Sequence, residues 1–270
     1  MSRRVVVTGI GVMSPIGCGR GAFVSGLREA RPGIGAIRRF DASAFPTRIA
    51  GEVSALPPVT EIALPQDAEG LHRDPKARFA LAAGREALDQ AFGGETPPYP
   101  APRRALSLAA GLEIFHLEDL LPYLQDSQHG AIDGAGILAA LAEHAPGATL
   151  QIPADLAARS LAADIEARGG YSLNVSACAA GSQAIGEASR AIGDGRADMI
   201  LAGGYDSMVN PLGLAGFALL EAMSTKNELE GAASRPFDKR RDGFVLGEGA
   251  AMLVLEERDQ ALARGATLLG

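Results

Sequence analysis

Residues 171–193 read YSLNVSACAAGSQAIGEASRAIG, and their hydrophobic pattern changes midway. The first part alternates apolar and polar side chains at Tyr171, Leu173 and Val175, which is typical of a β-strand. The second part repeats apolar side chains at helical spacing, which favours an amphipathic helix. Cys178 stands between the two parts. The pattern therefore predicts that Cys178 lies where a strand passes into a helix.

This position of Cys178 allows two interpretations. At a helix start the first backbone N–H groups have no partner within the helix and the dipole is positive, so a thiolate is favoured. The small neighbours Ala177, Ala179, Ala180 and Gly181 leave room for a substrate beside a nucleophilic sulfur. Free cysteine is also among the most buried residue types, so Cys178 can instead be structural. The residues of this stretch leave both interpretations open.

Composition limits the classes of protein that the chain can represent. With 270 residues and 47% hydrophobic content, it can form one large domain or two small ones with a packed core. The net charge of −7 argues against nucleic acid as the main partner, because phosphate binding needs concentrated Lys and Arg. Two cysteines are too few for a disulfide framework, which fits a reducing compartment, and we interpret Cys18 as structural.

The N-terminal residues resemble a signal peptide only superficially. Arg3 and Arg4 precede an apolar run, but Thr8 and Gly9 interrupt it early. No stretch reaches the roughly 18 apolar residues that a membrane-spanning helix needs. We therefore expect no membrane segment and a cytoplasmic protein.

Strands and helices are predicted to alternate along the chain. Apolar runs predict strands at 5–8, 105–108, 198–202 and 249–255, and helical spacing predicts helices at 19–28, 75–92, 153–168, 212–223 and 256–264. This alternation predicts an α/β layered fold with a largely parallel sheet. Residues 111–148 show no clear pattern.

Other candidate motifs have structural interpretations. Glu248 and Asp242 could form an acid/base pair, but we interpret them as parts of a glycine-rich loop that enters a strand. The glycines at 203–204 and 247–249 lack the strand-to-helix setting of a phosphate-binding loop, so no nucleotide site is expected. No cysteine and histidine spacing predicts a metal site.

Four motifs occur in order along the chain: VTGIGVMSPIG, NVSACAAGSQAIGEASRAI, ADMILAGGYDSM and SRPFDKRRDGFVLGEGAAMLVLE. Together they resemble the N-terminal half of a β-ketoacyl-acyl-carrier-protein synthase, most closely the elongating type II kind. The last motif, at 234–256, is the most specific. The resemblance implies a thiolase-like layered fold, with this chain as an N-terminal βαβαβαββ half and a mixed, mainly parallel sheet. It implies that residues 1–256 form that half with a variable cap around 111–148, and that 257–270 begin a C-terminal half.

The resemblance also implies a reaction. Cys178 would accept an acyl chain from acyl carrier protein by transthioesterification, and condensation with decarboxylated malonyl-carrier protein would give a 3-oxoacyl product in fatty acid or polyketide biosynthesis. The backbone N–H of Cys178 would be one donor of the oxyanion hole. No cofactor is implied, because the substrates are carried on the phosphopantetheine of the carrier protein. On this basis we prefer the nucleophile interpretation of Cys178.

Several family features are absent from this chain. Two histidines and a lysine that serve decarboxylation belong to the family's C-terminal half, so the isolated chain is not expected to perform condensation. The missing half or a complementary subunit is an expected partner, in a homodimer or heterodimer. The histidines that are present are interpreted as surface or loop residues: His72, His116, His129 and His144. The basic residues Arg73, Lys76 and Arg78 are candidates for docking the carrier protein.

Two alternatives compete with the enzyme hypothesis. One is a non-catalytic partner like the chain-length factors, which resemble ketosynthases but usually lack the cysteine. The other is a scaffold with a stable fold and no thiol reactivity. The presence of Cys178 favours the enzyme.

Overall fold

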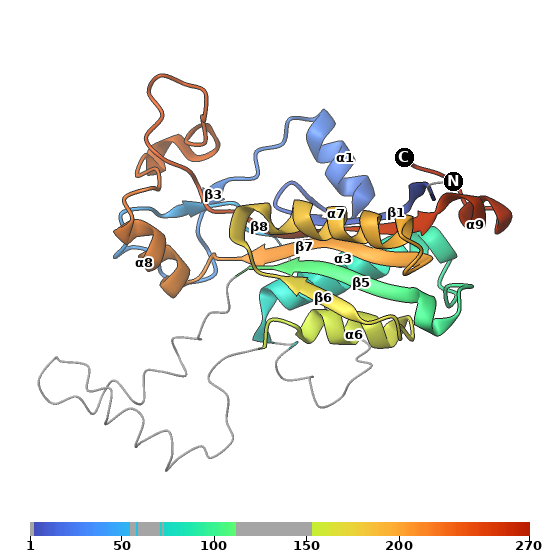
Figure 1. Ribbon diagram of the computed structural model, residues 1–270. Coiled ribbons are helices and arrows are strands. Elements are labelled where there is room, and N and C mark those ends of the chain that lie inside the picture. Colours follow the sequence, from blue (N-terminus) through green and yellow to red (C-terminus); the bar gives the residue numbers. More distant parts are fainter. Residues whose placement is uncertain (1–2, 55–57, 59–70, 72, 112–152) are drawn as a thin grey trace, which may run out of the picture.

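The computed structural model describes residues 3–54, 58, 71, 73–111 and 153–270, which form a layered α/β structure (Figure 1). Its strands are β1 (Val5–Ser14), β2 (Gly17–Cys18), β3 (Gly35–Ala36), β4 (Ile49–Ala50), β5 (Arg104–Ala110), β6 (Tyr171–Asn174), β7 (Met199–Ser207) and β8 (Glu248–Glu257). Its α-helices are α1 (Arg20–Arg28), α3 (Pro75–Phe92), α6 (Leu156–Asp164), α7 (Ala180–Gly193), α8 (Pro211–Leu219) and α9 (Arg258–Ala263). Short 3₁₀ turns are η2 (Ala101–Arg103), η3 (Ala177–Ala179) and η4 (Asn227–Ala232).

The main sheet has six strands in the order β2-β1-β8-β7-β5-β6. Strand β5 pairs in parallel with β6 and β7, whereas β8 pairs antiparallel with β7 and β1. Strands β1, β5, β6 and β7 therefore run in one direction and β8 runs against them. Along the chain, β1, α3, β5, α6, β6, α7, β7 and β8 follow the predicted βαβαβαββ order. The predicted α/β fold with a mixed, mainly parallel sheet is confirmed.

Helices cover both faces of this sheet (Figure 1). Helices α3 and α6 pack on one face, where Phe79, Leu161 and Leu201 belong to the largest buried cluster. Helix α7 packs on the other face, where Ile192 and Leu255 are buried together. The sheet is therefore buried on both sides, as expected for strands that read as continuous apolar runs.

Helix α3 has the bounds that the sequence predicts, because both of its ends carry local signals. The Asp74 side chain accepts a hydrogen bond from the backbone N–H of Lys76 (2.9 Å), and Pro75 occupies the first turn. Gly93 ends the helix with a φ of 64°, which glycine adopts without strain.

Strand β1 is longer than predicted, because its glycines do not end it. A Cβ at Gly9 would lie 2.1 Å from the carbonyl oxygen of Ala87, and one at Gly11 would lie 1.8 Å from that of Ala83. These glycines therefore let helix α3 approach the strand closely. The expected end of β1 at Thr8 was wrong, since glycine here serves packing between elements.

Other element boundaries also differ from the prediction. Strand β7 continues through its two glycines to Ser207, and β8 extends to Glu257, so that α9 starts only at Arg258. Helices α6 and α8 are shorter than the predicted ranges. The predicted variable cap at 111–148 lies, apart from Gly111, outside the described residues.

A buried polar cluster lies where the C-terminal end of β8 pairs with the N-terminal part of β1. The carboxylate of Glu256, which is fully buried, accepts hydrogen bonds from Thr8, Tyr99 and Arg264, the last at 2.6 and 2.8 Å. The guanidinium of Arg264 also lies over the ring of Phe92, 4.5 Å from its centre. Burial, with the adjacent Glu256 carboxylate adding to it, raises the pKa of Tyr99 well above its usual range. This cluster fixes the C-terminal end of β8 to the rest of the fold.

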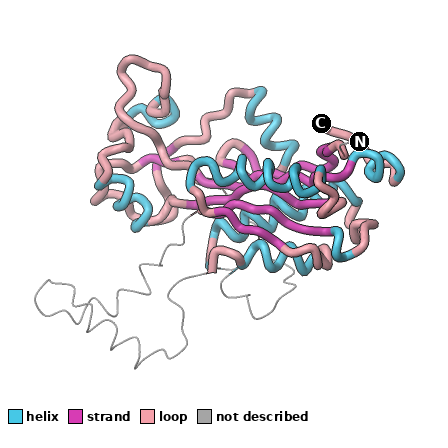
Figure 2. Tube along the Cα trace, in the orientation of Figure 1, coloured by secondary structure: helices cyan, strands magenta, loops and turns pink. Residues whose placement is uncertain are grey.

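The carboxyl ends of β1, β5 and β7 meet at one edge of the sheet, where β8 begins. Figure 2 shows long loops gathered beyond this edge, around α8 and β3. Because parallel strands end together there, the edge is where this class of fold usually places a site.

Candidate functional site

Cys178 lies in the 3₁₀ turn η3, directly between strand β6 and helix α7. The predicted strand-to-helix junction is therefore confirmed. The Cys178 side chain is exposed, so it is not the buried structural cysteine of the alternative interpretation. Cys18 is also exposed, but it lies in the two-residue strand β2.

The backbone just before Cys178 has an uncommon conformation. Ala177 has a φ of 57°, in the left-handed region that non-glycine residues adopt at a cost on the order of 1 kcal/mol. Side chains hold the turn: the Asn174 carboxamide accepts from the N–H of Ser176 (2.9 Å) and donates to Gln183 (2.8 Å). The hydroxyl of Ser176 also donates to the Gln183 side-chain oxygen. These contacts fix the direction in which Cys178 leaves the turn.

Helix α7 begins at Ala180 without a side chain that caps it. No side chain therefore accepts a hydrogen bond from the first backbone N–H groups of α7, which directly follow the turn η3 that contains Cys178. Gly181 has open space where a Cβ would project, so the first helical turn presents no bulk. The N–H of Ala180, the first residue of the helix, donates to the carbonyl of Ala177 in η3.

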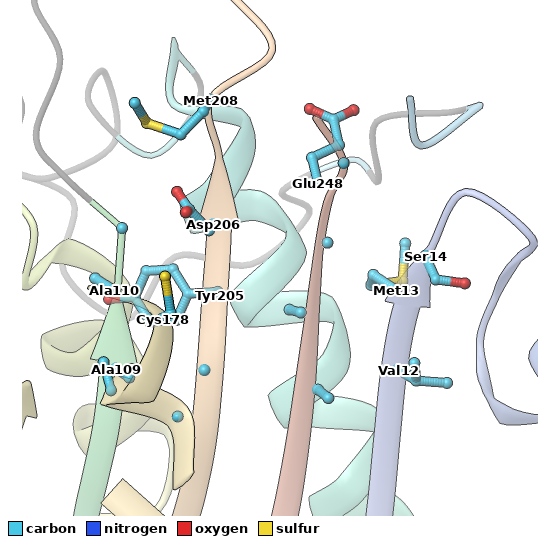
Figure 3. A pocket seen from close by; sticks show the side chains of 18 of the residues that line it. Val12, Met13, Ser14, Ala109, Ala110, Cys178, Tyr205, Asp206, Met208 and Glu248 are labelled. Carbon is cyan, nitrogen blue, oxygen red and sulfur yellow. The ribbon is translucent and has the colours of Figure 1, made fainter. Parts of the chain in front are cut away.

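A cavity of about 650 Å³ opens beside Cys178 at the edge of the sheet described above (Figure 3). Its wall comes from the ends of β1, β5 and β7, the start of β8 and the turn η3. The lining is largely apolar, with contributions from Ala110, Met208 and Phe217. The cavity can therefore hold a hydrocarbon chain next to the sulfur.

Glu248 lines this cavity but is held by the fold, as interpreted from the sequence. Its carboxylate accepts hydrogen bonds from Arg39 (2.7 Å), the backbone N–H of Val53 (2.8 Å) and the Ser207 hydroxyl (2.6 Å). Its side chain is fully buried.

Asp242 lies elsewhere in the fold and does not pair with Glu248. It accepts from the Ser224 hydroxyl at 2.9 and 3.0 Å and is ion-paired with Arg235 at 3.5 Å. Glu248 and Asp242 therefore have separate hydrogen-bond partners, which agrees with a structural role for each and not with an acid/base pair.

The basic residues considered for carrier-protein docking do not form one exposed group. Lys76 is buried, and its ammonium pairs with the Asp74 carboxylate at 2.8 Å. Lys76 is therefore not available to a partner, and this part of the hypothesis was wrong. Arg73 is exposed and Arg78 is half-buried.

The histidines His72, His116, His129 and His144 all lie outside the described residues. Among the residues that are described, no group of His, Cys, Asp and Glu could hold a metal ion. In the same part of the chain, no helix combines the length and the apolar character needed to cross a membrane.

Four residues of this region were not anticipated from the sequence. Asn174, Ser176 and Gln183 hold the turn before Cys178, and Asp206 places a carboxylate in the cavity wall. The Asn-x-Ser spacing before the cysteine is a signal for a side-chain-stabilised turn. Asp206 carries no such signal, because an acidic residue after an apolar strand is usually exposed.

Comparisons with known proteins agree with this geometry. Residues 2–261 match the family described as beta-ketoacyl synthase, N-terminal domain. The 3-oxoacyl-[acyl-carrier-protein] synthase 2 of Coxiella burnetii is 36% identical over 267 residues, which is 98% of this chain and 61% of that protein. The chain therefore spans about three-fifths of the length of this relative.

Solved ketosynthase structures superpose on the chain. One is the ishigamide ketosynthase/chain length factor, with 32% identity, a TM-score of 0.76 and coverage of 99% of this chain and 62% of that one. Another, AntDE:AntF, is a type II polyketide acyl-carrier protein in complex with its ketosynthase bound to the hexaketide. It has 26% identity, a TM-score of 0.74 and coverage of 99% and 61%.

The fold is therefore the thiolase-like α/β fold of these ketosynthases. The chain belongs to the β-ketoacyl synthase family and corresponds to its N-terminal domain.

Proposed function

We propose that this chain carries the acyl-accepting half of a 3-oxoacyl-acyl-carrier-protein synthase, with Cys178 as the nucleophile. The observation that carries the proposal is the exposed sulfur at the start of α7, beside an apolar cavity of about 650 Å³. A cysteine in such a place can exchange thioesters with little net free-energy change, since one thioester replaces another.

The chemistry of this first step is a transthioesterification. The thiolate of Cys178 attacks the carbonyl carbon of an acyl thioester, and a tetrahedral oxyanion forms. The backbone N–H of Cys178 is one donor to that oxyanion. Collapse of the intermediate breaks the bond to the pantetheine sulfur, which leaves as a thiolate and takes up a proton. The acyl chain then lies in the cavity.

The second step is condensation with a decarboxylated malonyl thioester in fatty acid or polyketide biosynthesis. We propose that groups from a C-terminal half or from a complementary subunit serve decarboxylation, and that residues 257–270 begin that half. Support comes from relatives that are longer than this chain, which covers 61% of the Coxiella burnetii protein. We propose an acyl carrier protein as the acyl donor, since the AntDE:AntF structure is named as an acyl-carrier protein in complex with its ketosynthase. Because the substrates would be carried on the phosphopantetheine of that protein, we propose no cofactor.

A second candidate function is a non-catalytic subunit that pairs with a ketosynthase. The similarity to the ishigamide ketosynthase/chain length factor favours it. It predicts a stable complex with a ketosynthase but no acyl adduct on this chain.

Transfer from a carrier protein tests the proposal. On mixing the chain with decanoyl-acyl carrier protein, we expect intact mass spectrometry to show a gain of one decanoyl group, together with release of the carrier protein with a free phosphopantetheine thiol. Carrier protein with a non-hydrolysable amide link is the matched control and should transfer nothing. If the mass of the folded chain stays unchanged, both alone and in the presence of its C-terminal partner, the result would favour the non-catalytic subunit.

A further inference from the structure

Three side chains close the turn that carries Cys178. The Oε1 atom of Gln183 accepts hydrogen bonds from Nδ2 of Asn174 (2.8 Å) and from the hydroxyl of Ser176. Oδ1 of Asn174 accepts a further hydrogen bond from the backbone N–H of Ser176 (2.9 Å). One carboxamide oxygen in α7 is therefore bonded to two residues just before the cysteine. We call Asn174, Ser176 and Gln183 together the Gln183 clamp.

Both ends of the Gln183 clamp belong to fixed parts of the fold. Asn174 is the last residue of β6 and pairs with Ala109 of β5. Gln183 directly precedes Ala184, which is fully buried and whose carbonyl accepts a hydrogen bond from the Ser107 hydroxyl (2.9 Å). The clamp therefore bridges the sheet and helix α7, with the turn η3 between them.

The turn inside the clamp contains a conformation that alanine rarely adopts. Ala177 has a φ of 57°, in the left-handed region where its Cβ is crowded by the backbone. Such a conformation persists only when the surrounding contacts enforce it. The clamp supplies these contacts, because it holds both the backbone N–H and the hydroxyl of Ser176, the residue just before Ala177. If Ala177 relaxed to a negative φ, the chain would leave the turn in another direction and Cys178 would move.

The clamp acts on the site without lining it. Ala177 and Cys178 line the cavity, whereas none of the three clamp residues is among the lining residues in the part of the chain that the structure describes. Figure 3 shows Cys178 at the cavity, beside Ala110 and Tyr205. A misplacement of a reacting group by about 1 Å can lower a rate on the order of a hundredfold, so a contact that fixes the turn affects the chemistry of the thiol.

We propose that Gln183 is a positioning residue for Cys178. Its carboxamide oxygen holds Ala177 in the strained left-handed conformation, and this conformation aligns the sulfur with an acyl carbonyl in the cavity. The inference rests on the proposed acylation of Cys178 and deepens it, because it names the group that keeps the nucleophile aligned.

The first test removes the acceptor oxygen and keeps the length of the side chain. In Gln183→Met, we expect the maximal rate of Cys178 acylation by decanoyl-pantetheine to fall about fivefold, as the loss of these exposed hydrogen bonds allows. The concentration of thioester that gives half of this rate should change less than about twofold, because the cavity is untouched. Gln183→Ala gives the same comparison if the Met variant does not fold. Ser182→Ala, at an exposed neighbour on the same helical turn, is the matched control and should be acylated at the rate of the unsubstituted chain.

Two further measurements separate positioning from a merely structural role. Alkylation of Cys178 by iodoacetamide, followed by peptide mapping, needs only an exposed thiolate, so its rate in Gln183→Met should change less than about twofold. Glycine adopts a positive φ without strain, so the clamp matters less when Ala177 is glycine. In the Ala177→Gly background, Gln183→Met should therefore lower the acylation rate less than about twofold, which a double-mutant cycle measures as coupling between the two residues.

The outcomes separate this inference from the function on which it rests. An unchanged acylation rate in Gln183→Met and Gln183→Ala, or a loss that persists in full in the Ala177→Gly background, would overturn the inference and leave the function standing. Equal losses of acylation and alkylation would also overturn it, because they would show a thiol that is less available and not one that is misaligned. No adduct on Cys178 in the unsubstituted chain would overturn the proposed function as well.

Discussion

Replacing Cys178 with alanine is expected to abolish acyl-enzyme formation, with a loss on the order of a thousandfold or more, because the second cysteine of the sequence, Cys18, does not line the cavity. The measurement is the rate at which decanoyl-pantetheine adds one acyl group to the chain, by intact mass. The variant should keep its fold, since the side chain is exposed in the turn η3 and a methyl group leaves no cavity there.

The chain contains a matched control for this prediction. Cys18 is the other cysteine and is also exposed, but it lies in β2 rather than at the start of a long helix. Cys18→Ala should therefore be acylated at the rate of the unsubstituted chain. The reverse pattern, with the adduct lost only in Cys18→Ala, would show that Cys18 and not Cys178 accepts the acyl group.

Replacing Glu256 with alanine is expected to lower the free energy of unfolding by about 3–5 kcal/mol, because it leaves the guanidinium of Arg264 without its buried partner. The same change removes the acceptor of the Thr8 and Tyr99 hydroxyl groups. Chemical denaturation monitored by circular dichroism measures the effect. Since β8 ends in this cluster, the variant should also be more sensitive to proteolysis near its C-terminus.

An exposed ion pair offers the comparison for Glu256. Glu29 pairs with Arg31 at 2.7 Å, but the two side chains are 59% and 43% exposed. Glu29→Ala should change stability by less than about 1 kcal/mol, because water screens such pairs. Equal losses in the two variants would contradict the structural role assigned to the buried cluster.

The elements that carry their own end signals were predictable from sequence. Helix α3 is the clearest example, since Asp74 and Pro75 mark its start and Gly93 follows its last residue. The junction at Cys178 was equally predictable. The spacing of apolar residues changes there from the two-residue period of a strand to the 3.6-residue period of a helix.

Features that depend on contacts between distant segments were not predictable in the same way. Gly9 and Gly11 resemble chain breakers, yet their lack of a Cβ permits close packing of α3 against β1. Lys76 resembles an exposed basic residue, yet the fold buries it against Asp74. Asp206 packs against Gly111 only because β5 and β7 lie side by side in the sheet. A single sequence contains no local signal for such pairs.

The most direct test is a crystal structure of the chain after incubation with decanoyl-pantetheine. We predict a covalent bond between Sγ of Cys178 and the acyl carbonyl carbon, with the hydrocarbon chain inside the cavity that Ala110, Met208 and Phe217 line. An unmodified Cys178 beside an empty cavity, in crystals of chain whose mass shows a decanoyl group attached elsewhere, would contradict the proposed acyl-accepting role.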